Sequence, residues 1–187
     1  DIEERIREVL RKARRVLERS EERSRELVER LRRVLEDSRR RTKRLTEEAK
    51  ELLDEVRKRL DKDEAREKLR KLEELIKRLK EKLDEVDKRL ADKVRRLSEM
   101  AKEVNDRLRK KIEDVERKLD EVRRRGGDKK LVEDLLREIE KIIKEIEDTT
   151  KRVVDELRRL LEEIKRTSDE LEKEVRKLLE EIKRATD

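Results

Sequence analysis

The sequence predicts an all-α fold, a single-chain antiparallel (up-down-up) three-helix bundle of long, nearly straight, coiled-coil-like helices. Three observations predict it. Charged residues make up 61% of the 187 residues and aliphatic residues most of the remainder, a composition typical of long helices. The apolar residues recur about every 18 residues, which is five helical turns, so each apolar column runs along a helix without drifting around it. Two short interruptions divide these columns into three apolar stripes of similar length.

The first helix is predicted over residues 2–60. Its apolar stripe starts at Ile2 and continues to Leu60, where the charged segment Asp61-Lys62-Asp63-Glu64 interrupts it. Asp61 is expected to cap the next helix, and Glu64 lies at the spacing of a capping box.

The second and third helices are predicted over residues 63–125 and 128–186. Three arginines end the second stripe, where the helix dipole favours positive charge. Gly126 and Gly127 follow, and glycine readily adopts the left-handed conformation that ends a helix. Asp128 is expected to cap the third helix.

Turns this short make neighbouring helices antiparallel, and residues 1–187 are expected to form one domain. The aliphatic residues suffice for the core of a closed monomer, with little left for a large second interface. The first and third helices carry broader apolar stripes than the second. This leaves the alternative of a binding module, in which a helical partner or a second copy docks along the groove between those two helices.

Polar residues interrupt the stripes at heights that match on all three helices. Short turns place two residues level when their numbers add to about 125 for the first and second helices, and about 253 for the second and third. By this count the polar residues form two layers, each drawn from all three helices. The first layer contains Ser20, Ser24, Asn105, Thr149 and Thr150. The second layer contains Ser38, Thr42, Asp87, Thr167 and Ser168.

These layers are expected to specify helix register. A buried hydroxyl or amide costs about 1–3 kcal/mol unless it is hydrogen-bonded. Polar groups at one height can satisfy each other, whereas slipped helices would leave them against Leu or Ile. The alternative is that the hydroxyls lie at the stripe edge and bond carbonyls one turn earlier in their own helices.

Asp87 needs a cation or several donors if it is buried. The candidate cations are Arg23 and Arg41, which lie beside the apolar stripe of the first helix. Thr46 and Ser98 are expected at the boundary of the stripes, outside the two layers.

Several function classes lack the residues they require. The chain has no His, Cys or Gly-rich phosphate loop, so we expect no enzyme, no cofactor and no metal site. The basic run over residues 39–44 is flanked by carboxylates and lacks aromatic residues for base stacking, so we expect a solvated face and no specific nucleic-acid partner. No apolar run is long enough for a membrane span and no targeting signal occurs, so we expect a soluble protein without a membrane partner.

The regular repeat, three equal helices, minimal turns, absent aromatics and layered polar residues resemble computationally designed helical bundles, generated parametrically and carrying buried hydrogen-bond networks. The resemblance covers the whole chain. It implies a structural scaffold with no native biochemical activity. In that family polar layers often encode the choice of partner between chains, whereas here all three helices belong to one chain. Natural spectrin-like repeats and apolipoprotein-like bundles are the alternative, although they usually contain Trp, Tyr, His or Pro.

Overall fold

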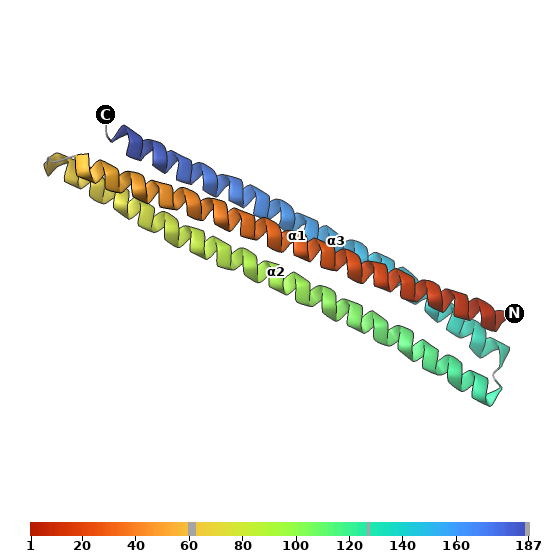
Figure 1. Ribbon diagram of the computed structural model, residues 1–187. Coiled ribbons are helices and arrows are strands. Elements are labelled where there is room, and N and C mark those ends of the chain that lie inside the picture. The colour runs from red at the N-terminus through yellow and green to blue at the C-terminus, as the bar shows by residue number, and fades with distance from the viewer. Residues whose placement is uncertain (60–62, 127, 186–187) are drawn as a thin grey trace. The chain divides into compact units, whose positions relative to one another are not determined.

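The computed structural model describes residues 1–59, 63–126 and 128–185 and contains three α-helices, α1 (Ile2–Arg59), α2 (Asp63–Arg125) and α3 (Lys129–Arg184). All three pairs of helices pack against each other, so the predicted all-α three-helix bundle is confirmed. The chain direction reverses from α1 to α2 and again from α2 to α3 (Figure 1). The predicted ends of the first and third helices at residues 60 and 186, the Asp61 cap and Gly127 lie outside the described residues.

Aspartate caps begin two of the helices. Asp128 Oδ1 accepts a hydrogen bond from the backbone N–H of Lys130 at 3.5 Å, and the Asp128 carbonyl accepts one from Leu131 at 3.1 Å. Asp1 plays the same role for α1, since its carboxylate accepts the backbone N–H of Glu3 at 3.3 Å. These contacts satisfy N–H groups that have no partner within a helix. The third helix therefore starts at residue 129, one residue later than predicted, because Asp128 is its cap.

Gly126 ends α2 in the left-handed conformation, with a φ of 64°. An L-residue with a side chain pays a steric cost in this region, whereas glycine does not. The role predicted for Gly126 as the helix terminator is thus visible in the backbone.

Residue contacts divide the chain into two compact units. Unit 1 comprises Asp1–Glu29 and Arg95–Arg159, and unit 2 comprises Arg30–Val94 and Leu160–Asp187. Each unit contains a segment of α1, a segment of α2 and a segment of α3. The single-domain organisation over residues 1–187 stays a prediction.

The core of unit 1 consists of aliphatic side chains from all three helices. Ile6 of α1, Val115 of α2 and Ile146 of α3 have no exposed surface, and Ile139 is 1% exposed. Fully burying a side chain of this size contributes about 1.5–3 kcal/mol. The repeated apolar columns of the sequence therefore meet in this core.

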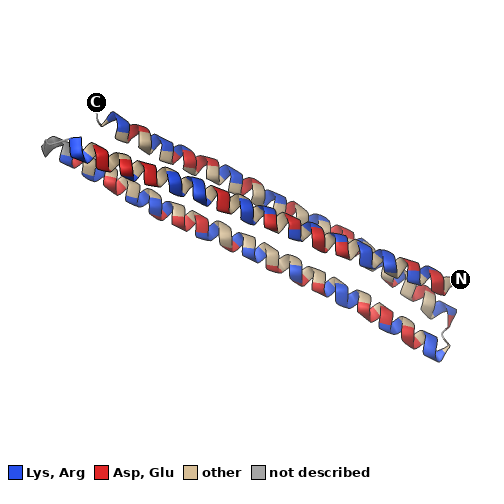
Figure 2. Cartoon of the chain, in the orientation of Figure 1, with Lys and Arg blue, Asp and Glu red and all other residues tan. Residues whose placement is uncertain are grey.

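The core of unit 2 has the same character. Val56 of α1, Ile76 of α2 and Val175 of α3 are buried together, with Ile182 packed in the same cluster. Outside the two cores, Lys and Arg are interspersed with Asp and Glu along all three helices (Figure 2). Each helix therefore combines an apolar stripe in the cores with a surface that carries charges of both signs.

Candidate functional site

The polar residues singled out in the sequence are largely buried, and each predicted layer falls within one unit. The first layer lies in unit 1 and the second in unit 2. Seven polar residues are buried among the described residues: Ser20, Ser24, Ser38, Thr42, Thr46, Asn105 and Ser168. The other layer members, Thr149, Thr150, Thr167 and Asp87, are half-buried. Most of the buried hydroxyls belong to α1, so this helix brings the most polar surface into the cores.

Two pairs of hydroxyls join α1 to α3. Ser38 Oγ donates a hydrogen bond to Ser168 Oγ at 2.7 Å in unit 2. In unit 1 the oxygens of Ser20 and Thr150 are 2.6 Å apart. Both pairs have the same sequence separation of 130 residues. The two parallel helices therefore pair their hydroxyls in the same register in each unit.

The hydroxyl pair of unit 1 is the first part of a short chain of hydrogen bonds. Thr150 Oγ1 also lies 2.5 Å from the carbonyl oxygen of Ile146. Since a hydroxyl has a single hydrogen, Thr150 donates it to the Ile146 carbonyl, and Ser20 donates to Thr150. Both hydroxyl hydrogens thus have acceptors.

Thr42 and Thr46 instead donate to carbonyls of their own helix. Thr42 Oγ1 lies 3.0 Å from the Ser38 carbonyl and 3.1 Å from that of Arg39. Thr46 Oγ1 donates to the Thr42 carbonyl at 2.7 Å. The alternative interpretation, bonding within the same helix, therefore holds for these two threonines.

Thr46 is 3% exposed, so its predicted place at the boundary of the stripe is wrong. Its hydroxyl needs no partner on another helix, because the carbonyl one turn earlier satisfies it. Burial therefore costs little at this position. Ser98 is half-buried, in line with a boundary position.

The remaining members of the layers are not joined to them by side-chain hydrogen bonds. Within the part of the chain that the structure describes, this holds for Ser24, Asn105, Thr149 and Thr167. Asn105 is nevertheless only 9% exposed. The structure thus brings together two hydroxyl pairs from the ten predicted residues, and Asn105 is largely buried without a side-chain hydrogen bond to the described residues.

Asp87 pairs with Arg39 and not with either of the predicted cations, Arg23 and Arg41. Arg39 Nε lies 2.9 Å from Asp87 Oδ1 and Arg39 Nη2 lies 2.8 Å from Asp87 Oδ2. The guanidinium therefore binds both carboxylate oxygens in a bidentate pair. The hydrogen bond to Asp87 raises the pKa of Arg39 above its usual value. The predicted cation Arg41 instead pairs with Glu172 of α3 at 3.3 Å, and Arg23 is not the partner either. The 18-residue column shows that an arginine lies beside the stripe but not which neighbouring helix it faces.

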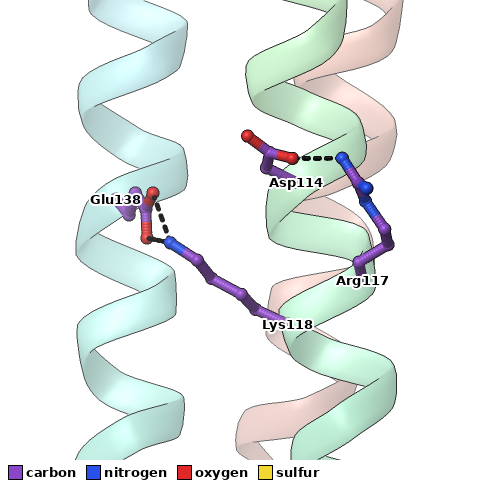
Figure 3. Close-up of polar contacts among 4 residues, drawn as sticks. All are labelled: Asp114, Arg117, Lys118 and Glu138. Carbon is purple, nitrogen blue, oxygen red and sulfur yellow. Dashed lines mark hydrogen bonds and ion pairs between the residues drawn. The ribbon is translucent and has the colours of Figure 1, made fainter.

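Among the described residues, four lysine–glutamate pairs join α2 to α3. In every pair the lysine is on α2 and the glutamate on α3, and Figure 3 shows the pair nearest the α2–α3 turn. In this pair, the ammonium group of Lys118 lies 3.3 and 3.5 Å from the two carboxylate oxygens of Glu138. The pairs are Lys82–Glu174, Lys93–Glu163, Lys111–Glu145 and Lys118–Glu138. From one lysine to the next along α2, the partner glutamate lies the same number of residues earlier on α3. This is the register of antiparallel helices.

Sequence reasoning missed this set of ion pairs, although the sequence contains a signal for it. The lysines and the glutamates recur at matching intervals on their two helices, each close to a whole number of helical turns. Ion pairs between α1 and α2 use arginine instead, as in Arg14–Glu116 and Arg57–Glu73. Charged residues therefore distinguish the two interfaces of α2.

A groove opens at the second layer, between α1 and α2 in unit 2. Its volume is about 410 Å³, and Ser168 and Leu171 of α3 contribute to its lining. The threonines at positions 42 and 46 line the α1 side. The second layer is therefore more accessible than its burial alone indicates.

No cluster of three or more His, Cys, Asp or Glu side chains suited to a metal ion occurs within residues 1–59, 63–126 and 128–185. No helix in this described part is both long enough and apolar enough to cross a membrane. Comparison of the chain with protein-family models, curated proteins and solved structures finds no match.

Proposed function

We propose that the chain is a designed structural scaffold with no native biochemical activity. Its polar core residues specify how the helices align. The observation that carries this proposal is the shared separation of 130 residues in the hydroxyl pairs Ser20–Thr150 and Ser38–Ser168. The two pairs lie in different units but favour the same alignment of α1 with α3.

The cost of misalignment supports this role. If α1 slipped by two turns against α3, Ser38 would lie level with Leu161 or Val175 in place of Ser168. Both of these residues are buried and apolar. A buried hydroxyl that loses its partner costs about 1–3 kcal/mol. Both hydroxyl pairs would break in the same slip, so their penalties act together against one misaligned state.

The lysine–glutamate pairs support the same conclusion for α2 and α3. Each ion pair is partly exposed, and such pairs contribute about 0–1 kcal/mol. Their value lies in selectivity, because a slip of a single turn separates several pairs at once. Hydroxyls thus align α1 with α3, and charges align α2 with α3.

The local geometry supports a designed origin. Asp128 caps α3 directly after the turn, and Gly126 ends α2 with a positive φ. These are the connections that idealised helical backbones use. Together with the regular 18-residue columns, they indicate agreement between local signals and the fold along the chain.

Size-exclusion chromatography with light scattering tests the proposal against the binding module. The scaffold is expected to elute as one species with the mass of a single chain, 23.0 kDa, over a wide range of protein concentrations. A dimer or larger species would instead support association along the groove between α1 and α3, and would contradict a self-sufficient scaffold.

A further inference from the structure

The groove of unit 2 results from a run of small residues on the core-facing side of α1. Four successive inward positions hold Ser38, Thr42, Thr46 and Ala49, all of them buried. One 18-residue repeat earlier, the same columns hold Ser20, Ser24, Val28 and Leu31. Two aliphatic side chains are thus replaced by smaller ones at the end of the run. Ser38, Thr42 and Thr46 line the α1 side of the groove, and their short side chains leave the space of about 410 Å³ between α1 and α2.

This volume lies within the range of about 300–1,000 Å³ that is usual for small-molecule sites. Aliphatic side chains from all three helices line the groove, including Leu35, Leu83 and Leu171. The threonine hydroxyls on its floor are already bonded to carbonyls of their own helix. The body of the groove therefore suits an apolar ligand and demands few polar contacts from it.

Two lysines lie together at one end of the groove. Among its lining residues, Lys50 is the last on α1 and Lys80 the first on the antiparallel α2. Contact with the ammonium group of Lys50 lowers the pKa of Lys80, and burial lowers it further. The nearby carboxylates Glu47 and Asp84 act in the opposite direction but do not outweigh these effects. Over the whole lining of the groove, four basic side chains face three carboxylates, which leaves a small excess of positive charge. These are Arg39, Lys43, Lys50 and Lys80 against Glu47, Asp84 and Asp87.

Elsewhere on the rim, Arg39 and Asp87 neutralise each other in their bidentate pair, and Lys43 lies between this pair and Lys50 along α1. From Leu35 to Lys50 the α1 side extends over about 22 Å at 1.5 Å per residue, which is long enough for a chain of ten carbons.

We propose that this groove binds a singly charged anion with an unbranched apolar chain, a medium-chain carboxylate. The carboxylate lies between Lys50 and Lys80, and the chain lies over Leu83 towards Leu35. Glu47 and Asp84 flank the lysines and disfavour a head group with two negative charges. This binding site goes beyond the scaffold role and does not depend on it.

Isothermal titration calorimetry of the full chain with hexanoate, octanoate and decanoate at pH 7 tests the site. We expect one saturable site per chain, with affinity rising about fourfold for each added methylene group, because each buried methylene contributes a roughly constant transfer free energy. Decyltrimethylammonium has a chain of the same length with a positive head group, and it is expected to bind at least tenfold more weakly than decanoate.

Variants locate the site. The double variant Lys50→Gln/Lys80→Gln is expected to weaken decanoate binding about tenfold or more, since it removes both cations. Its matched control, Lys102→Gln/Lys110→Gln, removes two exposed lysines of unit 1 and should leave affinity unchanged. Thr42→Leu is expected to abolish binding by filling the groove, with circular dichroism confirming that the helices are retained.

Three results would each overturn the proposal. They are the absence of saturable decanoate binding at millimolar concentration, equal affinity for the cationic and anionic amphiphiles, and equal weakening by the two double-lysine variants. Because the lysine variants alter only surface charge, the test remains decisive even if Thr42→Leu fails to fold.

Discussion

At the scale of single residues, hydrogen bonding determines which polar side chains the cores tolerate. Ser168 is 3% exposed and is paired with Ser38, whereas Thr46 is equally buried and is satisfied by its own helix. The sequence shows the same kind of residue in each case. Which acceptor a hydroxyl reaches depends on its rotamer and on the distance to the next helix, so the sequence alone could not separate the two outcomes.

Removing one hydroxyl of the Ser38–Ser168 pair should cost as much as removing both. We expect Ser38→Ala to lower the free energy of unfolding by about 1 kcal/mol, because it leaves a buried hydroxyl without its partner. The variant Ser38→Ala/Ser168→Ala should lose no more than either single variant. Urea unfolding of the four proteins in a double-mutant cycle measures this coupling. Strictly additive losses would show that the two hydroxyls act independently.

Asn105 should be replaceable by an apolar residue with a gain in stability. The residue is 9% exposed and its side chain has no hydrogen bond to the described residues, and its amide atoms are not among the fully buried ones. Asn105→Leu is expected to raise the free energy of unfolding by about 1 kcal/mol, since it adds apolar surface at a largely buried position where the amide makes no side-chain hydrogen bond. Thermal melting followed by circular dichroism tests this, with Asn105→Ala as the control that removes the amide without adding apolar surface. A lower Tm for Asn105→Leu would mean that the amide is stabilising.

At the scale of helices, the periodic signals were sufficient to predict that the chain forms three long α-helices. α2 covers Asp63–Arg125 as predicted, because Gly126 and the preceding arginines act locally. The partner of Asp87 could not be predicted in the same way. It depends on how each helix is rotated about its axis, and this rotation decides whether Arg39 or Arg41 faces α2.

The lysine–glutamate pairs allow a charge-exchange test between α2 and α3. In unit 1, the variant Lys111→Glu/Lys118→Glu should lower the free energy of unfolding by about 1–2 kcal/mol, because it replaces two attractions with repulsions. Adding Glu145→Lys/Glu138→Lys should recover most of this loss by restoring opposite charges across the interface.

Urea unfolding at low and high salt measures both effects, and the difference should shrink at 1 M salt because exposed charges are screened. Failure of the second pair of substitutions to recover stability would contradict the assignment of these residues as partners.

At the scale of the whole molecule, the 18-residue repeat predicts more than helix formation. The residues that break the repeat lie at recurring intervals, and counting from the turns assigned each predicted layer to residues that fall within one unit. The groove of unit 2 was not predicted, since it arises where several small residues follow one another on one face of α1. A column count considers one position at a time, whereas a cavity depends on the summed volume of neighbouring side chains.

The central claim is that hydroxyl pairs set the register of α1 against α3. The most direct test is double electron–electron resonance, which measures the distance between spin labels at the exposed positions Arg33 and Lys165. The parent should give one narrow distance distribution. Removing the paired hydroxyls with Ser20→Ala, Ser38→Ala, Thr150→Val and Ser168→Ala should leave the helices folded but add a second, longer or shorter distance. This distance would correspond to an axial slip of one or two turns, or about 5–11 Å along the helices. An unchanged, single, narrow distribution would contradict the account.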